Sequence, residues 1–405
     1  MHPKDFSIAD YNYVLPPDRI AQEPLSQRDH SKLLVYNNGA MEEDLFCNLL
    51  NYLPENATLV FNDTKVIHAR IIFKNENGAN IEVFLLEPME PVRDMQLAMF
   101  LHGACTWRCM VGNVKKWREK VLCRKIKIGD KAATLEACMR EKGEDDFVID
   151  FSWKPETVSF AQVLEAAGNV PLPPYIRRNA GTEDQDRYQT LYAFQDGSVA
   201  APTAGLHFTE SLFKKFTGKN IYSLFLTLHV SAGTFRPVKA QTLKDHRMHE
   251  EQFVIRKMVL EELINKKTPL VAVGTTSLRT LESLYWLGLK LLKGDESLIV
   301  DQWMPYESIM SITTADSMEA ILNFMEKKEL TQLIAETKLL IAPGYAFKLT
   351  DALITNFHMP RSTLLLLVSA FIGDDWKKVY EYALKNNFRF LSYGDASLMW
   401  RSVEH

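Results

Sequence analysis

The pattern of apolar and polar positions changes twice along the chain. In residues 41–53, Leu45, Leu49 and Tyr52 recur at helical spacing and Pro54 ends the pattern, which predicts a helix. Residues 57–61 then form a short apolar run that is typical of a buried strand. The opening part is therefore expected to supply one helix and one core strand.

A stretch with the rhythm of short strands follows. Residues 67–73 and 81–86 flank a polar turn that contains Asn77 and Gly78, which predicts a β-hairpin. Further strand-like runs occupy residues 96–101, 121–128 and 147–151. Regular strands without helices between them indicate a small barrel or sandwich.

After about residue 155 the pattern changes to one of alternating helices and strands. Ser159 can cap a helix through Ala167, Gly168 suits its end, and the prolines of residues 171–174 force an extended passage. Strands are expected at residues 221–230, 270–273 and 339–342, and helices at residues 258–266 and 278–286.

These three patterns predict an α/β fold with two domains. Residues 1–65 and 155–405 would form a main domain with a mixed sheet, interrupted by a smaller all-β, barrel-like domain at residues 66–154. The length of 405 residues agrees with two domains.

Composition narrows the class of protein. The 47 basic and 51 acidic residues nearly balance, which excludes a strongly basic protein that coats nucleic acid but leaves room for a local basic patch. The five cysteines contain no CxxC pair and the first ten residues are polar, so reduced thiols and a cytoplasmic location are expected. Residues 363–372 are apolar but too few to span a membrane, which indicates a core segment.

The segment of residues 271–279 carries the clearest local signal. A buried strand ends at Gly274, and Thr275 and Thr276 then stand where hydroxyl groups can cap a following helix. Free N–H groups at such a helix start attract a carboxylate or phosphate, and Arg279 lies one turn further on. The alternative is a structural helix whose arginine faces a buried acid.

Residues 199–210 combine small residues with a histidine. Gly205 would allow close approach of a ligand to the backbone, and His207 lies just before a helix that Thr209 can cap. His207 could accept a proton or donate to a ligand, but a structural histidine bonded to the backbone explains the pattern equally well.

Other polar groups gather towards the C-terminus. Asn356 and His358 lie between two apolar segments, where loop residues commonly meet a substrate. Asp351 and Asp395 could join them, or could cap helices and pair with arginines. His246 and His249 invite a metal interpretation, but HxxHEE is not the HExxH motif, so no metal is expected.

Basic residues are concentrated in one run of the β-rich stretch. Residues 115–127 contain seven Lys or Arg against the single acid Glu119, and Arg177 and Arg178 form a second group. Contact with RNA phosphates would suit both groups, whereas a charge run is more often a solvated face.

Conspicuous motifs extend along almost the whole chain in one order, at residues 10–17, 20–22, 28–29, 61–64, 171–176, 186–190, 201–208, 229–230, 233–235, 246–250, 274–283, 343–345, 355–365 and 392–395. In this order they resemble the S-adenosylmethionine:tRNA ribosyltransferase-isomerases of queuosine biosynthesis. The chain differs from the family pattern at Lys65, His68 and Ser231, and residues 285–340 are longer than is usual.

The resemblance implies a reaction and two substrates. The ribosyl unit of S-adenosylmethionine would move to the 7-aminomethyl-7-deazaguanine at the wobble position of a tRNA anticodon loop, giving epoxyqueuosine-tRNA with release of adenine and methionine. The sulfonium acidifies the neighbouring ribose 5′ carbon, so a positioned base can start the rearrangement without a metal or a redox cofactor. The expected protein is a monomer that does not associate with membranes.

The resemblance also implies roles for residues already singled out. His207 is the first choice for the base and His358 the second, while Asp63, Asp351 and Asp395 would contact ribose hydroxyls or orient a histidine. The groups expected to bind S-adenosylmethionine are Gly205, Gly274, Thr275, Thr276, Arg279 and Asn356. The groups expected to bind tRNA are Lys115, Lys116, Arg118, Arg124, Lys125, Arg177 and Arg178.

Three alternatives remain open at this point. One is a non-catalytic RNA-binding module that uses the basic run alone. The length and the departures from the family pattern also fit a diverged paralogue that acts on another acceptor. The histidine cluster would fit a metal-dependent hydrolase.

Overall fold

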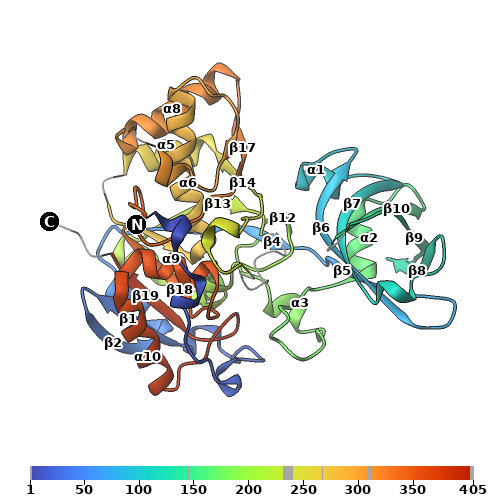
Figure 1. Ribbon diagram of the computed structural model, residues 1–405, viewed down its shortest axis with the longest axis horizontal. Helices are drawn as coiled ribbons and strands as arrows, with labels where there is room; N and C mark the ends of the chain where they lie inside the picture. Colours follow the sequence, from blue (N-terminus) through green and yellow to red (C-terminus); the bar gives the residue numbers. More distant parts are fainter. Residues whose placement is uncertain are drawn as a thin grey trace.

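The computed structural model describes residues 2–143, 146–230, 240–266, 268–308, 310 and 312–401; Ser231 and residues 233–235, named above, lie outside them. The ribbon divides into a large body and a smaller one (Figure 1). The segments that carry β4 (Thr64–Val66) and α3 (Asp184–Arg187) lie between them. β4 pairs in parallel with β12 (Gln195–Ser198).

A ten-stranded mixed sheet forms the large body. From edge to edge its strands are β16 (Ile299–Val300), β17 (Gln332–Thr337), β14 (Glu251–Arg256), β13 (Tyr222–Leu228), β3 (Thr58–Asn62), β15 (Leu270–Val273), β18 (Ala352–Asn356), β19 (Ala396–Trp400), β1 (Lys32–Asn37) and β2 (Ala40–Leu45). β13, β3, β15 and β18 run parallel to one another, and antiparallel strands flank them on both sides. The prediction of a mixed α/β sheet is confirmed.

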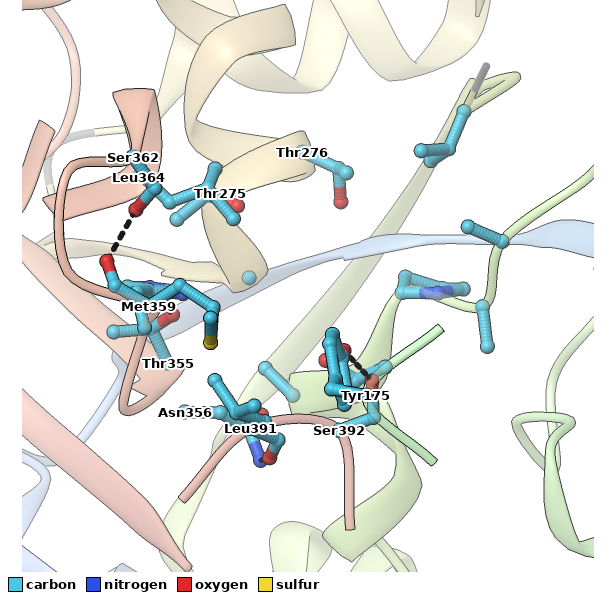
Figure 2. A pocket seen from close by; sticks show the side chains of 18 of the residues that line it. Tyr175, Thr275, Thr276, Thr355, Asn356, Met359, Ser362, Leu364, Leu391 and Ser392 are labelled. Carbon is cyan, nitrogen blue, oxygen red and sulfur yellow. Dashed lines mark hydrogen bonds between the residues drawn. The ribbon is translucent and has the colours of Figure 1, made fainter. Parts of the chain in front are cut away.

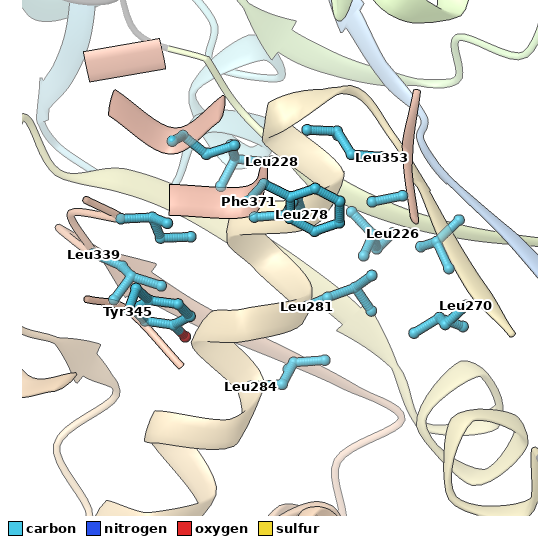
Figure 3. Close-up of a cluster of buried hydrophobic side chains, with 14 of the residues drawn as sticks. Leu226, Leu228, Leu270, Leu278, Leu281, Leu284, Leu339, Tyr345, Leu353 and Phe371 are labelled. Carbon is cyan, nitrogen blue, oxygen red and sulfur yellow. The ribbon is translucent and has the colours of Figure 1, made fainter. Parts of the chain in front are cut away.

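Both faces of this sheet are covered, because successive side chains of a strand point to opposite faces. Val60 and Leu353 face a core formed with the longer helices (Figure 3), whereas Leu59 and Ile354 face a second core. The first face carries α5 (Lys257–Asn265), α6 (Gly274–Leu292), α8 (Thr314–Lys327), α9 (Thr363–Ile372) and α10 (Trp376–Lys385). The second carries the 3-10 turns η5 (Phe46–Tyr52) and η7 (Thr203–His207) and helix α4 (Glu210–Phe216).

The smaller body is an antiparallel sheet. Its strand order is β11 (Gly168–Asn169), β5 (Arg70–Lys74), β6 (Asn80–Glu90), β7 (Ala104–Gly112), β10 (Phe147–Lys154), β9 (Lys131–Lys142) and β8 (Leu122–Ile128). The sheet curls so that β8 also contacts β5, and α2 (Phe160–Ala167) packs into its core. The curled antiparallel sheet agrees with the predicted barrel-like architecture, but helix α2 means that this body is not all-β.

The boundary and content of the smaller body differ from the prediction. Because α2 and β11 belong to this body, it extends to Asn169 and the expected end at residue 154 is too early. Residues 96–101 were expected to form a strand, but Asp94 caps a short helix there, α1 (Met95–Met99). Strands β7 and β9 were missed.

Three expectations for the large body also need correction. Residues 41–53 form β2 and the turn η5 instead of one helix, since β1 and β2 pair as a hairpin. Residues 339–342, which were expected to form a strand, are buried but irregular; the strand that precedes them in the chain, β17, ends at Thr337. Helix α6 begins at Gly274, four residues before the predicted start. The remaining short helix is α7 (Met304–Glu307).

The apolar run of residues 363–372 forms α9, which is largely buried in the core. No helix in the described part of the chain is long and apolar enough to cross a membrane.

Candidate functional site

A pocket of about 340 Å³ opens at the carboxyl ends of β15 and β18 (Figure 2). This is the edge of a parallel sheet where ligands bind in open α/β folds. Its walls come from residues 174–175, 200–204, 230, 274–276, 355–356, 358–359, 362, 364 and 391–392. Among the described residues none of those that line it is Asp, Glu, Lys or Arg, so neutral dipoles must supply its polarity.

The start of α6 forms one end of the pocket. Gly274 lies at a φ of +89°, a conformation that glycine adopts without strain, and the backbone turns there directly from β15 into the helix. Contrary to the prediction, no side chain caps this helix; Ser277 donates instead to the carbonyl oxygen of Val273 at 2.8 Å. Among the described residues, no side chain therefore accepts from the first N–H groups of α6, and the buried hydroxyl of Thr276 has no partner.

Arg279 does not reach the pocket. Its guanidinium forms a buried ion pair with Glu251 on β14, which is the alternative that the sequence left open. Its Nε and Nη2 atoms are buried and have no partner in the described ranges of the chain.

Asn356 contributes a buried, unpaired acceptor to the pocket. Its Nδ2 lies 3.1 Å from the carbonyl oxygen of Leu391 and 3.2 Å from Nε2 of His207. A carbonyl oxygen only accepts hydrogen bonds, so the amide nitrogen must face Leu391 and the amide oxygen must face away. Asn356 is 3% exposed, and its Oδ1 has no partner in the part of the chain that the structure describes.

The same contacts assign the tautomer of His207. Because the Asn356 amide nitrogen donates to Nε2, that atom carries the lone pair and Nδ1 carries the proton. Nδ1 then donates to the hydroxyl of Ser31 at 2.8 Å. Burial lowers the pKa of His207 to about 4. His207 is thus a neutral ring that orients Asn356 from behind the pocket wall.

His358, in contrast, lines the pocket. Its Nε2 lies 3.0 Å from the hydroxyl of Thr355, and burial lowers its pKa to about 3. The backbone of the same residue is held by the hydroxyls of Tyr13 and Tyr380. The ring is therefore an uncharged imidazole in a fixed place.

The three predicted carboxylates lie outside the pocket. Asp63 accepts from Thr227 at 2.6 Å and faces Arg256, and burial is the main cause that raises its pKa. Asp351 immediately precedes β18, whereas Asn356 is the last residue of that strand, so the two lie at opposite ends of it. The carboxylate of Asp351 accepts from the main-chain N–H of Leu270. Asp395 binds the main chain of Lys32 and the guanidinium and main chain of Arg389. All three already have structural partners.

Gly205 serves packing and does not line the pocket. A Cβ atom there would lie 2.0 Å from the hydroxyl of Tyr192, so the glycine allows η7 to pack against that ring. Its neighbour Ala204 lines the pocket instead.

The predicted RNA-binding residues fall into two places. Lys115 and Lys116 lie on a short turn, and Arg118, Arg124 and Lys125 on or before β8, all in the smaller body. Arg124 is tied to the carbonyl oxygen of Ile72. Arg177 is exposed, while Arg178 forms a bidentate ion pair with the buried Asp184 at 2.5 and 2.8 Å.

Sequence reasoning missed parts of the pocket. Tyr175 and Ser392, whose hydroxyls lie 2.7 Å apart, come from motifs that were noticed but given no role (Figure 2). His229, from another of the motifs, does not line the pocket; its Nδ1 lies 2.9 Å from the hydroxyl of Thr64, and its Nε2 is buried without a partner among the described residues. The described residues contain no group of three His, Cys, Asp or Glu that could hold a metal ion.

Comparison with known proteins gives consistent matches over the full length. A family model described as queuosine biosynthesis protein matches residues 8–399. Proteins named S-adenosylmethionine:tRNA ribosyltransferase-isomerase from Aromatoleum aromaticum and Sulfurihydrogenibium sp. are 36% and 38% identical, covering 96% and 97% of this chain and 96% and 99% of theirs. A crystal structure of S-adenosylmethionine tRNA ribosyltransferase from Thermotoga maritima is 27% identical over 96% of this chain and 99% of that one, with a TM-score of 0.45.

Proposed function

Because the chain belongs to the family of queuosine biosynthesis proteins, we propose that it transfers and isomerises the ribosyl moiety of S-adenosylmethionine onto 7-aminomethyl-7-deazaguanine at the tRNA wobble position. The products are epoxyqueuosine-tRNA, adenine and methionine. The observation that carries this proposal is the match along nearly the whole chain to relatives of that name. S-adenosylmethionine serves as the co-substrate.

The pocket can bind the two charges of the methionine end. The open N–H groups of α6 and the helix dipole suit its carboxylate. β15 and β18 are neighbours with Val273 beside Ile354, so their continuations bring Thr275 close to Asn356. Adjacent strands lie about 4.8 Å apart, a spacing that suits the carboxylate and ammonium of one α-amino acid. The unpaired Oδ1 of Asn356 would accept from the ammonium.

The remaining wall suits the adenosyl part. Pro174, Tyr175, Met359, Leu364 and Leu391 present mostly apolar surface. Such surface can pack against a purine and its ribose, and it excludes water from the reacting carbon.

His358 is the better candidate for the base, a reversal of the order expected from sequence. It lines the pocket as a neutral imidazole, whereas both ring nitrogens of His207 are engaged. The sulfonium makes the C–H bond at the ribose 5′ carbon acidic, and His358 would take that proton. His207 would act as a positioning residue through Asn356.

The reaction itself is the test. The protein is incubated with S-adenosylmethionine and tRNA that carries 7-aminomethyl-7-deazaguanine, and free adenine and the mass of the RNA are measured. We expect equimolar adenine and ribosyl-modified RNA. Adenine release without a mass increase of the RNA would indicate a different acceptor, as a diverged paralogue requires, and no reaction with either substrate would overturn the proposal.

The metal-dependent hydrolase is the less favoured alternative. His246 and His249 do not meet a third ligand among the described residues. Loss of activity on treatment with a chelator, restored by zinc, would revive that alternative.

A further inference from the structure

A second, smaller hollow lies beside the substrate pocket. Its walls include Arg28, Arg187, Arg389, His207 and Tyr393, and Ser392 lines both this hollow and the pocket. Its volume is about 20 Å³, enough for one water molecule. A larger ligand would lie across its mouth.

Arg28 and Arg187 hold each other's chain segments in a reciprocal arrangement. Arg28 donates to the carbonyl oxygens of Asp186 at 2.6 Å and Gln189 at 2.7 Å. Arg187 donates to the carbonyl oxygens of Leu25 and of Ser26, the latter at 3.2 Å. Each guanidinium has five N–H donors, so both are fixed in place with donors to spare.

This pair of positive charges is not neutralised within the described residues. Neither guanidinium has a carboxylate oxygen within 4.0 Å, unlike the neighbouring Arg389, which pairs with Asp395 at 3.1 Å. Burial and the charge of Arg187 lower the pKa of Arg28, and these two effects exceed those of Tyr393 and Asp186, which raise it. The two guanidinium groups carry like charges, are partly buried and are held close together by neutral carbonyl acceptors. Such an arrangement favours the binding of an anion between them.

We infer that Arg28 and Arg187 bind a backbone phosphate of the RNA, next to the nucleotide whose base enters the pocket. The inference rests on the proposed function. A nucleotide that leaves the stack to enter a pocket brings its flanking phosphates to the pocket mouth. The arginine fork is suited to a phosphate, and Ser392, which lines both cavities, places the pair beside the pocket.

The test compares Arg28→Gln and Arg187→Gln with Lys327→Gln, which removes an equal charge on α8, outside both cavities. Binding of tRNA carrying 7-aminomethyl-7-deazaguanine is measured over a range of salt concentrations. Each arginine variant should bind about tenfold more weakly and lose about 0.7 from the logarithmic salt slope. Binding of S-adenosylmethionine, measured by calorimetry, should stay unchanged, and Lys327→Gln should behave like the parent protein.

A synthetic anticodon stem-loop identifies the phosphate. Replacing either phosphate that flanks the wobble nucleotide by a neutral methylphosphonate should, at one of the two positions, abolish the difference between the parent protein and Arg28→Gln. If both arginine variants keep the parent salt slope, whether or not their melting temperature falls, the pair has only a structural role and the inference is wrong. If the parent protein binds no tRNA, the proposed function fails first.

Discussion

Two cavities of this molecule, the pocket at β15 and β18 and a hollow on the seven-stranded sheet, have comparable volumes. They differ in whether their polar groups have hydrogen-bond partners within the protein. The hollow on the seven-stranded sheet has a volume of about 460 Å³ and is larger than the pocket at β15 and β18, which has a volume of about 340 Å³. In the former, Arg140 binds Glu90, Asp150 and Thr106, so these polar groups already have partners within the protein. In the latter, Asn356 Oδ1 and Thr276 Oγ1 are buried without partners among the described residues.

The difference shows which property marks a ligand site. A buried polar atom without a partner costs free energy, so such an atom in a pocket wall marks a place that a ligand can complete. Volume alone would have favoured the hollow on the seven-stranded sheet as the ligand site. The unpaired atoms and the open helix start favour the pocket at β15 and β18.

The largest effect on kcat is expected from a substitution of His358. This substitution tests whether the pocket takes part in the reaction or only binds a ligand. His358→Gln should lower kcat about 100- to 10,000-fold, because a general base is lost. Equilibrium binding of S-adenosylmethionine should change little. A pKa of about 3 keeps this ring unprotonated above about pH 4, so any fall in kcat between pH 8 and pH 5 must come from another group. Full turnover by the variant would exclude His358 as the base.

A second change asks whether the unpaired amide oxygen binds substrate. Asn356→Leu should lower kcat/KM for S-adenosylmethionine about 100-fold, since it removes the acceptor and also the donor to His207 and Leu391. Ser31→Ala alters only the far end of the same chain of hydrogen bonds, and should raise KM more than it lowers kcat. Equal kinetics for Asn356→Leu and the parent protein would contradict the proposed methionine site.

Acid should destabilise the large body through its buried histidines. Burial lowers the pKa of His207 and His229 to about 4 and of His358 to about 3, below the unfolded value of about 6.5. The unfolded chain therefore binds protons first as pH falls, and stability present above pH 6.5 is lost between pH 6.5 and 4. Each ring should remove about 2 kcal/mol between pH 6.5 and 5.

Urea unfolding at these two pH values checks this expectation. His207→Asn should reduce the pH dependence, whereas His102→Gln, a change on the exposed surface of the smaller body, should leave it as in the parent protein. The same pH dependence in all three proteins would show that His207 does not contribute.

The smallest effect comes from a matched pair of threonines, one in each hollow. Thr276→Val removes an unpaired hydroxyl and should raise the KM for S-adenosylmethionine about tenfold. Thr106→Val removes a hydroxyl that already donates to Asp150 at 2.7 Å, and should leave KM and kcat unchanged. If the two variants have the same kinetics, the state of the polar groups does not distinguish the hollows.

Local chemistry determined much of the molecule in advance. The hairpin at Asn77–Gly78, the Ser159 cap and the strand just before Gly274 follow from turn, capping and burial preferences of a few adjacent residues, and the structure contains all three. The family motifs also contain most of the residues that line the pocket.

Only the tertiary structure decided which of these residues meet. The sequence could not tell that Arg279 would pair with Glu251, or that His207 would lie behind Asn356 rather than in the pocket. It also could not tell that Asp351 would bind the main chain of Leu270, at the end of β18 away from the pocket. The same holds for Arg28 and Arg187, which are 159 positions apart in the chain and yet hold each other's backbone. Partners of buried polar groups are long-range contacts, so they depend on strand order and register, which no short stretch of sequence encodes.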